Sequence, residues 1–365
     1  MVVISFGYIF LLLISYIIVY FYKMRLKKNT IFISLVFFAV AFGIIVYHVD
    51  PPIQWDLFRH FLELERIRAG GINYLFSYNC IYHNQIGSAL LYYLVSLQPD
   101  NHILPMLAII IEYLILAYIV ADYIDTNQLS ARYVFLALAL QFSFGDLTWI
   151  ISMVRQPLAC AFCALAAYLD IYKKKKIGIL CYIIGISIHP GVIGVILVRL
   201  MFLFKIKKTV MAAICILWGT FSNVLASILQ ASSITWIRFF GSMLYNYISD
   251  FSKTADIRFF IFKIIYILVV LFLVIRSERG YENLNKYNLF FKTAAIFTLG
   301  GVVSQQIFMR YAMQLGYFCI PVSDYITQES DALKLRISDV ILFAFFFGSF
   351  AYQFVALTSH GVGII

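Results

Sequence analysis

Charged side chains are scarce in this sequence, and acidic ones are the scarcest. Asp and Glu together number 18, against 28 Lys and Arg, and only 13% of the 365 residues are charged while 63% are hydrophobic. A soluble core of this size cannot hide so much apolar surface. The composition therefore argues against a water-soluble enzyme and predicts an all-α, polytopic integral membrane protein.

Cysteine and histidine are also few, with six of each. Most cysteines lie inside apolar blocks, where a small hydrophobic residue is their ordinary role. Cys160 and Cys163 have the CxxC spacing of metal and redox sites, but no second pair of Cys or His accompanies them. Because no set of two carboxylates and a histidine stands out either, we expect no metal and no cofactor.

A cleavable leader is not expected. The first apolar block, Val2 to Tyr22, is too long for the core of a signal peptide, follows no basic residue and precedes no small-residue cleavage site. We interpret it as a retained first helix.

The remaining apolar blocks have the length of membrane helices, since about 20 residues cross a hydrocarbon layer of about 30 Å. We expect about twelve spans in one membrane domain over residues 1–365. They are 2–22, 31–48, 103–121, 133–150, 157–172, 177–188, 191–204, 209–229, 258–275, 288–308, 311–326 and 337–357.

The net charge of +10 does not indicate nucleic-acid binding, because the basic residues form no single patch. They fall in short clusters between apolar blocks, which is the pattern of cytoplasmic loops. The sequence thus predicts that both termini lie outside and that these clusters lie inside. The clusters are Lys23, Arg25, Lys27 and Lys28; Lys173 to Lys176; Arg199, Lys205, Lys207 and Lys208; and Arg276, Arg279 and Lys286.

Two longer segments, 49–102 and 230–257, are then extracytoplasmic. Within the first, 86–97 is apolar but only about 12 residues long, which is short for a span. If it crossed the membrane, every later basic cluster would change sides. We therefore expect a re-entrant or interfacial helix there.

Arginines on the outer side are the informative residues, because a planar guanidinium binds phosphate and carboxylate alike. Arg155 and Arg310 are expected in tight connections between helices, where a charge needs an anionic partner. The other outer arginines have an alternative role as anchors at lipid headgroups or as local ion pairs, as for Arg66 and Arg68. His189 stands before Pro190 at a predicted helix break and has the alternative role of a helix cap.

Arg155-Gln156 opening a helix, a basic turn, and His189-Pro190 opening the next helix resemble the core of the Wzy-type and EpsG-type bacterial polysaccharide polymerases. The polar segment after the second helix, with Asp56, and the late Arg310-Tyr311 resemble further pieces of the EpsG pattern. The resemblance covers most of the chain in topology, on short motifs.

The resemblance implies an enzyme of the bacterial inner membrane that joins repeat units at its outer face. A glycan on polyprenyl pyrophosphate is transferred to a hydroxyl of another lipid-linked unit, and lipid pyrophosphate leaves. The implied partners are this glycan lipid, membrane lipid, a chain-length regulator and a flippase. Residues expected to bind the substrate and its pyrophosphate are Arg155, Arg310, Arg59, Gln156 and Tyr311.

A general base is also needed for the attacking hydroxyl. His189 is the first choice because an imidazole titrates near neutrality. Asp56 and Glu63 are the alternatives.

Two other classes compete with this interpretation. A polytopic glycosyltransferase using lipid-linked sugars, or the related O-antigen ligase, would want an acidic pair, and Glu63 with Glu65 is the one such pair in the first outer segment. A transporter or flippase would show paired broken helices and deep charges. Glu112, in the middle of an apolar block, is the one carboxylate expected at that depth.

Overall fold

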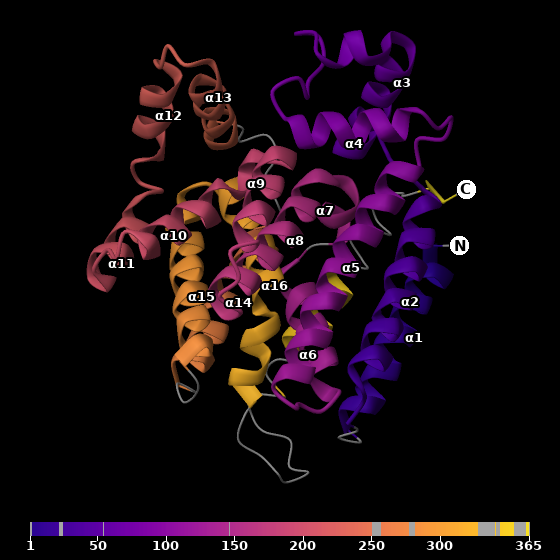
Figure 1. The fold of residues 1–365 in the computed structure, drawn as a ribbon, viewed down its shortest axis with the longest axis vertical. Coiled ribbons are helices and arrows are strands. Elements are labelled where there is room, and N and C mark those ends of the chain that lie inside the picture. Colours follow the sequence, from indigo (N-terminus) through magenta and orange to yellow (C-terminus); the bar gives the residue numbers. More distant parts are fainter. Residues whose placement is uncertain are drawn as a thin grey trace.

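The computed structural model describes residues 2–21, 25–53, 55–145, 147–249, 257–276, 282–327, 340, 344–353 and 363–364. Most of this part of the chain is helical (Figure 1). The strands described within it are β1, Val49–Asp50, and β2, Gly363–Ile364, which pair antiparallel over two residues. The predicted all-helical class is confirmed.

The α-helices range from 6 residues in α7 to 24 residues in α5. They are α1 Val2–Phe21, α2 Lys28–Tyr47, α3 Asp56–Leu75, α4 Ile86–Ser96, α5 Ile103–Thr126, α6 Arg132–Phe144, α7 Leu147–Ser152, α8 Arg155–Ala167, α9 Gly178–Ile188, α10 Ile193–Leu203, α11 Lys208–Leu217, α12 Ser222–Gln230, α13 Thr235–Ser249, α14 Ile257–Arg276, α15 Glu282–Gly300 and α16 Gln305–Thr327.

Three of these helices are long and apolar enough to cross a membrane, namely α2, α5 and the part of α14 over Ile257–Ile275. A fourth crossing is available if α11 and α12, which meet at 81°, form one bent span. Other apolar helices, such as α6, α9 and the stretch Pro190–Leu203, are shorter. The described helices therefore indicate a membrane protein, with three or four candidate spans rather than twelve.

Breaks within the apolar blocks account for part of this difference. The expected span 133–150 is divided at Gly145, whose extended ψ of 173° ends α6. The expected span 209–229 is divided between α11 and α12, and 157–172 ends in a π-helical turn, Tyr168–Tyr172. The length of an apolar block shows how much apolar sequence is present. It does not show where the helix breaks, because the breaks depend on local backbone geometry.

One predicted boundary is wrong in a way that matters for the site. The turn expected just before Arg310 lies earlier, because α15 ends at Gly300 and a 3₁₀ turn, Gly301–Val303, leads into α16 at Gln305. Arg310 is thus within a helix and not in a tight connection. Much of the expected last span, 337–357, lies outside the described residues, although 344–353 are helical. Lys23, Asp250, Lys253, Asp256 and Arg279 also fall outside them.

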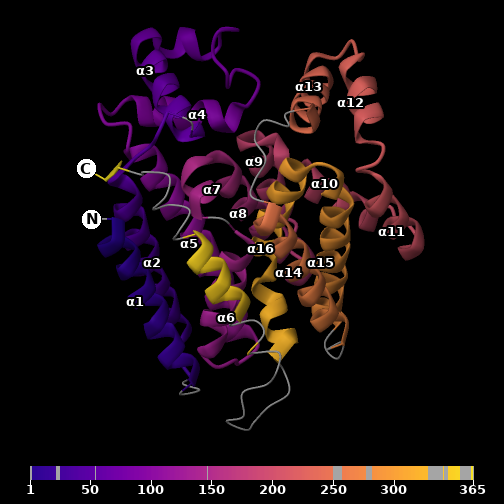
Figure 2. The same ribbon diagram turned by 180° about the vertical axis from the view of Figure 1, so that it is seen from behind.

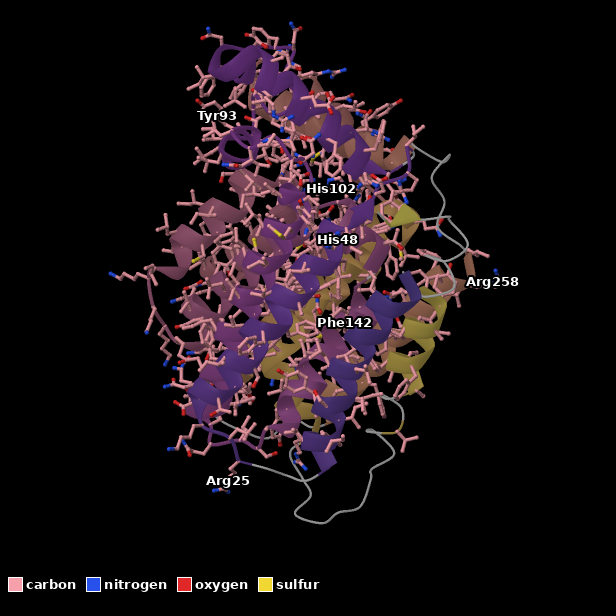
Figure 3. All side chains as sticks on the ribbon, turned by 90° about the vertical axis from the view of Figure 1, so that its right-hand side faces the viewer. Arg25, His48, Tyr93, His102, Phe142 and Arg258 are labelled. Carbon is pink, nitrogen blue, oxygen red and sulfur yellow. The ribbon has the colours of Figure 1, made fainter. Side chains whose placement is uncertain are left out.

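The helices α3, α4, α12 and α13 gather at one end of the main helical bundle, with α9 between the two groups in both views (Figures 1 and 2). The short helix α4 confirms that 86–97 is helical, and it lies across the end of the bundle. In the side view, Tyr93 and His102 lie toward this end, Phe142 lies farther down and Arg25 lies at the opposite end (Figure 3).

Two of the basic clusters meet at a shared carboxylate. Asp122, near the end of α5, lies 2.7 Å from Lys28 Nζ and 2.8 Å from Lys173 Nζ, and it accepts a hydrogen bond from the Tyr168 hydroxyl. The expectation that these two clusters share one side of the membrane agrees with this contact.

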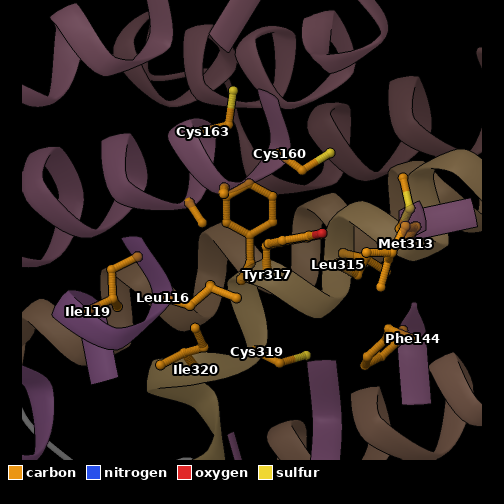
Figure 4. Close-up of a cluster of buried hydrophobic side chains, with 14 of the residues drawn as sticks. Leu116, Ile119, Phe144, Cys160, Cys163, Met313, Leu315, Tyr317, Cys319 and Ile320 are labelled. Atoms are coloured by element: carbon orange, nitrogen blue, oxygen red, sulfur yellow. The ribbon is translucent and has the colours of Figure 1, made fainter. Parts of the chain in front are cut away.

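The core lies where α5, α8 and α16 pack together (Figure 4). Leu116 of α5, Cys160 of α8 and Tyr317 of α16 are all at most 2% exposed. All six cysteines are buried and free. Small residues in α8 permit close helix packing, and at Gly185 of α9 a Cβ atom would lie 2.8 Å from Cys163 Sγ.

The ends of α11 and α15 touch through backbone. A Cβ atom at Gly219 would overlap the carbonyl oxygen of Gly300, and one at Gly300 would overlap that of Cys215. The Trp218 ring stacks on Phe297 at 4.5 Å between centroids, and its Nε1 donates to the Phe297 carbonyl at 2.7 Å. This contact holds α11 beside α15.

Candidate functional site

The candidate site begins where α8 starts. Val154 precedes this helix with a φ of +24° while its side chain is only 2% exposed. A positive φ on a β-branched residue costs about 1–3 kcal/mol, and such strain gathers at functional sites. Pro157 is tolerated in the first turn because its missing N–H group would have no helical partner. The backbone therefore fixes Arg155 as the first helical residue.

Arg155 is half-buried and has neutral partners. Its Nη1 donates to Gln85 Oε1 at 2.6 Å, and its guanidinium carbon lies 4.4 Å from the centroid of the Tyr82 ring. Its buried Nε has no hydrogen-bond partner, and no carboxylate of the described chain forms an ion pair with it. A partly desolvated cation with neutral neighbours is suited to bind an anion.

His60 and two tyrosines support this arginine from the side of α3. His60 Nδ1 and the Tyr82 hydroxyl share a hydrogen bond of 2.5 Å, and the Tyr82 and Tyr92 ring centroids lie 4.2 Å apart. Burial, with Arg155 and Arg59 nearby, holds the pKa of His60 well below its usual value. Burial raises the pKa of Tyr82 to about 12. Both groups are therefore neutral near pH 7.

His189 occupies the break between α9 and a 3₁₀ turn, Pro190–Val192. Its backbone is extended, and its Nδ1 accepts a hydrogen bond from the Gly191 N–H at 3.0 Å. An imidazole nitrogen that accepts has no proton, so neutral His189 carries its proton on Nε2. The ring thus caps the turn through one nitrogen and presents a donor at the other.

Two neighbouring helices hold this break in place. The Ser88 hydroxyl of α4 donates to the carbonyl of Ile188 at 2.5 Å, and Gln314 Nε2 of α16 donates to the carbonyl of Gly191 at 2.9 Å. The carbonyls on both sides of His189 are therefore satisfied by side chains from distant parts of the chain.

Arg310 reaches the same region from the second turn of α16. Its Nη1 donates to Gln156 Oε1, and its guanidinium carbon lies 5.9 Å from the Trp149 ring centroid. Burial, with Arg155 and Arg310 nearby, holds the pKa of His189 well below its usual value. The structure thus brings together four sequence-predicted residues, namely Arg155, Gln156, His189 and Arg310.

The predicted acidic residues have other contacts. Glu63 is 1% exposed, and its carboxylate accepts hydrogen bonds from Arg66 (3.2 Å), the Tyr74 hydroxyl (3.2 Å) and the Ile81 N–H (3.0 Å). Asp56 lies one helical turn before His60 and faces Arg59 at 3.5 Å, with 33% and 54% of the two side chains exposed. Asp56 is therefore the more accessible of the two carboxylates.

Tyr311 packs against aromatic side chains. Its ring packs edge-on against Phe297 at 5.1 Å and Trp218 at 5.8 Å between centroids, and a Cβ at Gly194 would lie 2.5 Å from it. This places the ring in the aromatic cluster between α10, α11 and α15. Among the described residues, no three His, Cys, Asp or Glu side chains gather as a set that would hold a metal ion.

Sequence reasoning missed Tyr82, Gln85, Gln314 and the place of His60 beside them. The two residues that contact Arg155 come from the turn before α4, 70 or more positions away. Only their presence in a polar segment between apolar blocks was visible in the sequence. No family model, curated protein or solved structure matches this chain.

Proposed function

We propose that this protein polymerises polyprenyl-pyrophosphate-linked oligosaccharide repeat units at the outer face of the bacterial cytoplasmic membrane. The observation that carries the proposal is Arg155, a half-buried cation with neutral partners beside Arg310 and His189. The motifs of the chain resemble those of Wzy-type and EpsG-type polymerases. The surroundings of Arg155 favour a bound anion.

Lipid pyrophosphate is the leaving group of this reaction, and negative charge develops on it as the glycosidic carbon–oxygen bond breaks. Cations already fixed at that position stabilise the transition state without reorganisation. Arg155 and Arg310 supply two guanidinium groups, and His189 adds an N–H donor at Nε2. Apolar helices around the site provide a surface for the polyprenyl chain.

The acceptor hydroxyl forms the new bond to the sugar and gives up its proton. The hydrogen bond from Gly191 implies the tautomer in which His189 donates at Nε2, so His189 would accept a proton there only after releasing the Gly191 N–H. Asp56 has a partly exposed carboxylate one helical turn from His60 and is the base that we favour, with Arg59 beside it. Glu63 instead holds the backbone of Ile81.

The polytopic arrangement is part of this proposal. The end with Lys28, Asp122 and Lys173 would face the cytoplasm, and α3 and α4 would lie outside. Because all six native cysteines are buried, a single added cysteine can be labelled from outside with an impermeant reagent. Labelling of Lys174→Cys in intact cells would contradict this orientation, whereas Tyr78→Cys should react.

The activity itself is tested with purified protein in lipid vesicles and a polyprenyl-pyrophosphate-linked repeat unit. Polymer length and released lipid pyrophosphate are measured together. We expect Arg155→Lys to lose most activity, because an ammonium does not reproduce the planar fork of a guanidinium. The matched control is Arg238→Lys, at an exposed arginine that contacts the carbonyl of Ser232. Equal polymer from both variants would show that Arg155 only anchors its helix.

A transporter of lipid-linked glycans is the second candidate. The helix breaks at Gly145, His189 and Gly301 resemble those around transport sites, and Lys263 and Glu112 are ionisable side chains at most 1% exposed. The same vesicles separate the two functions, since a transporter moves the glycan lipid between leaflets without lengthening the glycan. The acidic pair wanted by a lipid-sugar glycosyltransferase is less favoured, because Glu63 is buried and Glu65 is exposed.

A further inference from the structure

The turn between α3 and α4, residues 76–85, is folded into successive tight turns. The N–H groups of Cys80, His83 and Gln85 donate to the carbonyls of Ser77, Cys80 and Tyr82 at 2.8–3.2 Å. We call this segment the strap. Its backbone is therefore internally bonded and not an open loop.

Two side chains of α3 anchor the strap. Glu63 accepts the Ile81 N–H at 3.0 Å, and His60 bonds the Tyr82 hydroxyl at 2.5 Å. Residues three apart on a helix share one face. Both anchors are at most 5% exposed, so adjacent strap residues are fixed by adjacent turns of the same helix.

The strap in turn holds the guanidinium of Arg155 on two sides. The Tyr82 ring lies against it at 4.4 Å, and Gln85 Oε1 accepts from Nη1 at 2.6 Å. A guanidinium over an aromatic face is attracted by the ring quadrupole, more strongly when partly desolvated. Gln85 occupies Nη1, and the buried Nε has no partner in the described chain. The guanidinium thus keeps donor capacity that the described chain does not use.

We propose that Tyr82 is a positioning residue that orients the Arg155 guanidinium toward a pyrophosphate, with Glu63 fixing the adjacent backbone of the strap. This inference rests on the proposed function, because it assigns pyrophosphate as the anion. Tyr82 acts through its ring face, so the ring matters more than the hydroxyl. Tyr82 and His60 are at most 5% exposed, so both would act through Arg155 and not by touching the substrate.

A double-mutant cycle tests the inference with farnesyl pyrophosphate as the probe. Its dissociation constant is measured for the purified full-length protein in detergent micelles, for Tyr82→Leu, Arg155→Gln and the double variant. We expect Tyr82→Leu to weaken binding about tenfold, the range of a partly desolvated cation–π contact. In the Arg155→Gln variant, the additional Tyr82→Leu change should raise the dissociation constant by less than about twofold, because the effects of substitutions at contacting residues are not additive.

Two further measurements separate positioning from general damage. Tyr82→Phe keeps the ring and should bind within about twofold of the unchanged protein, since a cation–π contact needs only the ring face. Farnesyl monophosphate should lose less affinity than the pyrophosphate in Tyr82→Leu, because an oriented fork favours the ligand with more phosphate oxygens. Tyr245→Leu, at a half-exposed tyrosine of α13, is the matched control and should not alter either affinity.

The outcomes distinguish this inference from the proposed function. If the unchanged protein does not bind farnesyl pyrophosphate, both are overturned. If it binds and the losses in the cycle add fully, or if Tyr82→Phe loses as much as Tyr82→Leu, the positioning role is overturned while the anion site stands.

Discussion

The side-chain carbonyl of Gln156 accepts a hydrogen bond from the guanidinium of Arg310, across 154 positions of the chain. Gln156 directly follows Arg155 in the sequence. The first turn of α8 therefore carries Arg155 and also provides the hydrogen-bond acceptor for Arg310. An amide suits this position because its oxygen accepts a hydrogen bond from the guanidinium without neutralising the positive charge of Arg310.

Gln156→Glu tests the need for a neutral acceptor. The carboxylate would form a close ion pair with Arg310 and remove one positive charge from the site. We expect polymer formation to fall at least about tenfold, a loss of about 1.4 kcal/mol of transition-state stabilisation, with protein abundance in the membrane unchanged. Gln98→Glu, at an exposed residue before α5, should behave as the unchanged protein. Full activity of Gln156→Glu would show that charge balance around Arg310 is unimportant.

His189→Asn separates the capping role from the chemical role. Asparagine places an oxygen near the position of Nδ1, so it can still accept the Gly191 N–H and cap the turn. It lacks a group at the position of Nε2. We expect normal abundance and thermal stability but little polymer, whereas His189→Ala should lose both cap and activity. Normal polymer from the asparagine variant would make His189 a structural cap alone.

His60 should make stability depend on pH. Its pKa in the folded protein is below the usual value of about 6.5. As pH falls below about 6.5, the unfolded chain takes up a proton that folded His60 does not, so the free energy of unfolding falls. We expect the thermal midpoint in detergent to drop between pH 7 and 5, and to drop less in His60→Gln. The control is His83→Gln, and an unchanged pH slope in His60→Gln would contradict the burial of a neutral imidazole.

Lys263 should stabilise the break between α6 and α7. Its side chain is fully buried, and its Nζ donates to the carbonyls of Ser143 and Gly145 and lies 4.6 Å from the Phe259 ring centroid. Lys263→Met keeps the volume but removes these bonds. We expect the free energy of unfolding to fall by about 1–3 kcal/mol, the cost of leaving a buried polar group unsatisfied. Thermal unfolding in detergent measures this, with exposed Lys208→Met as the control.

The helical class and the short helix within 86–97 could be predicted because they depend on composition and block length. The residues around Arg155 could be predicted only in part. Arg155, Gln156 and His189 stand out as polar residues at helix starts in an apolar chain. The place of Arg310 was misjudged, because the chain turns at Gly301 and not beside the arginine.

Tyr82 and Gln85 were beyond the reach of sequence reasoning. Their contact with Arg155 depends on how the strap folds back from α3, and that fold depends on Glu63 and His60 bonding it from one helix face. Nothing in the local pattern of residues 76–85 indicates a partner 70 positions later. Likewise, the sequence suggests Glu63 as a general base. Its structural role is hidden there, because the three groups that donate hydrogen bonds to its carboxylate come together only in the folded chain.

The contact between Gly219 and Gly300 offers a way to recognise distant relatives of this chain. At most packed positions, a larger side chain on one helix can be matched by a smaller one on its neighbour over evolutionary time. Here the colliding atoms belong to the backbone, so no replacement elsewhere makes room for a Cβ at either position. We therefore expect this pair of glycines to persist together in related chains even where the arginine motifs have drifted, which makes it a landmark for aligning them.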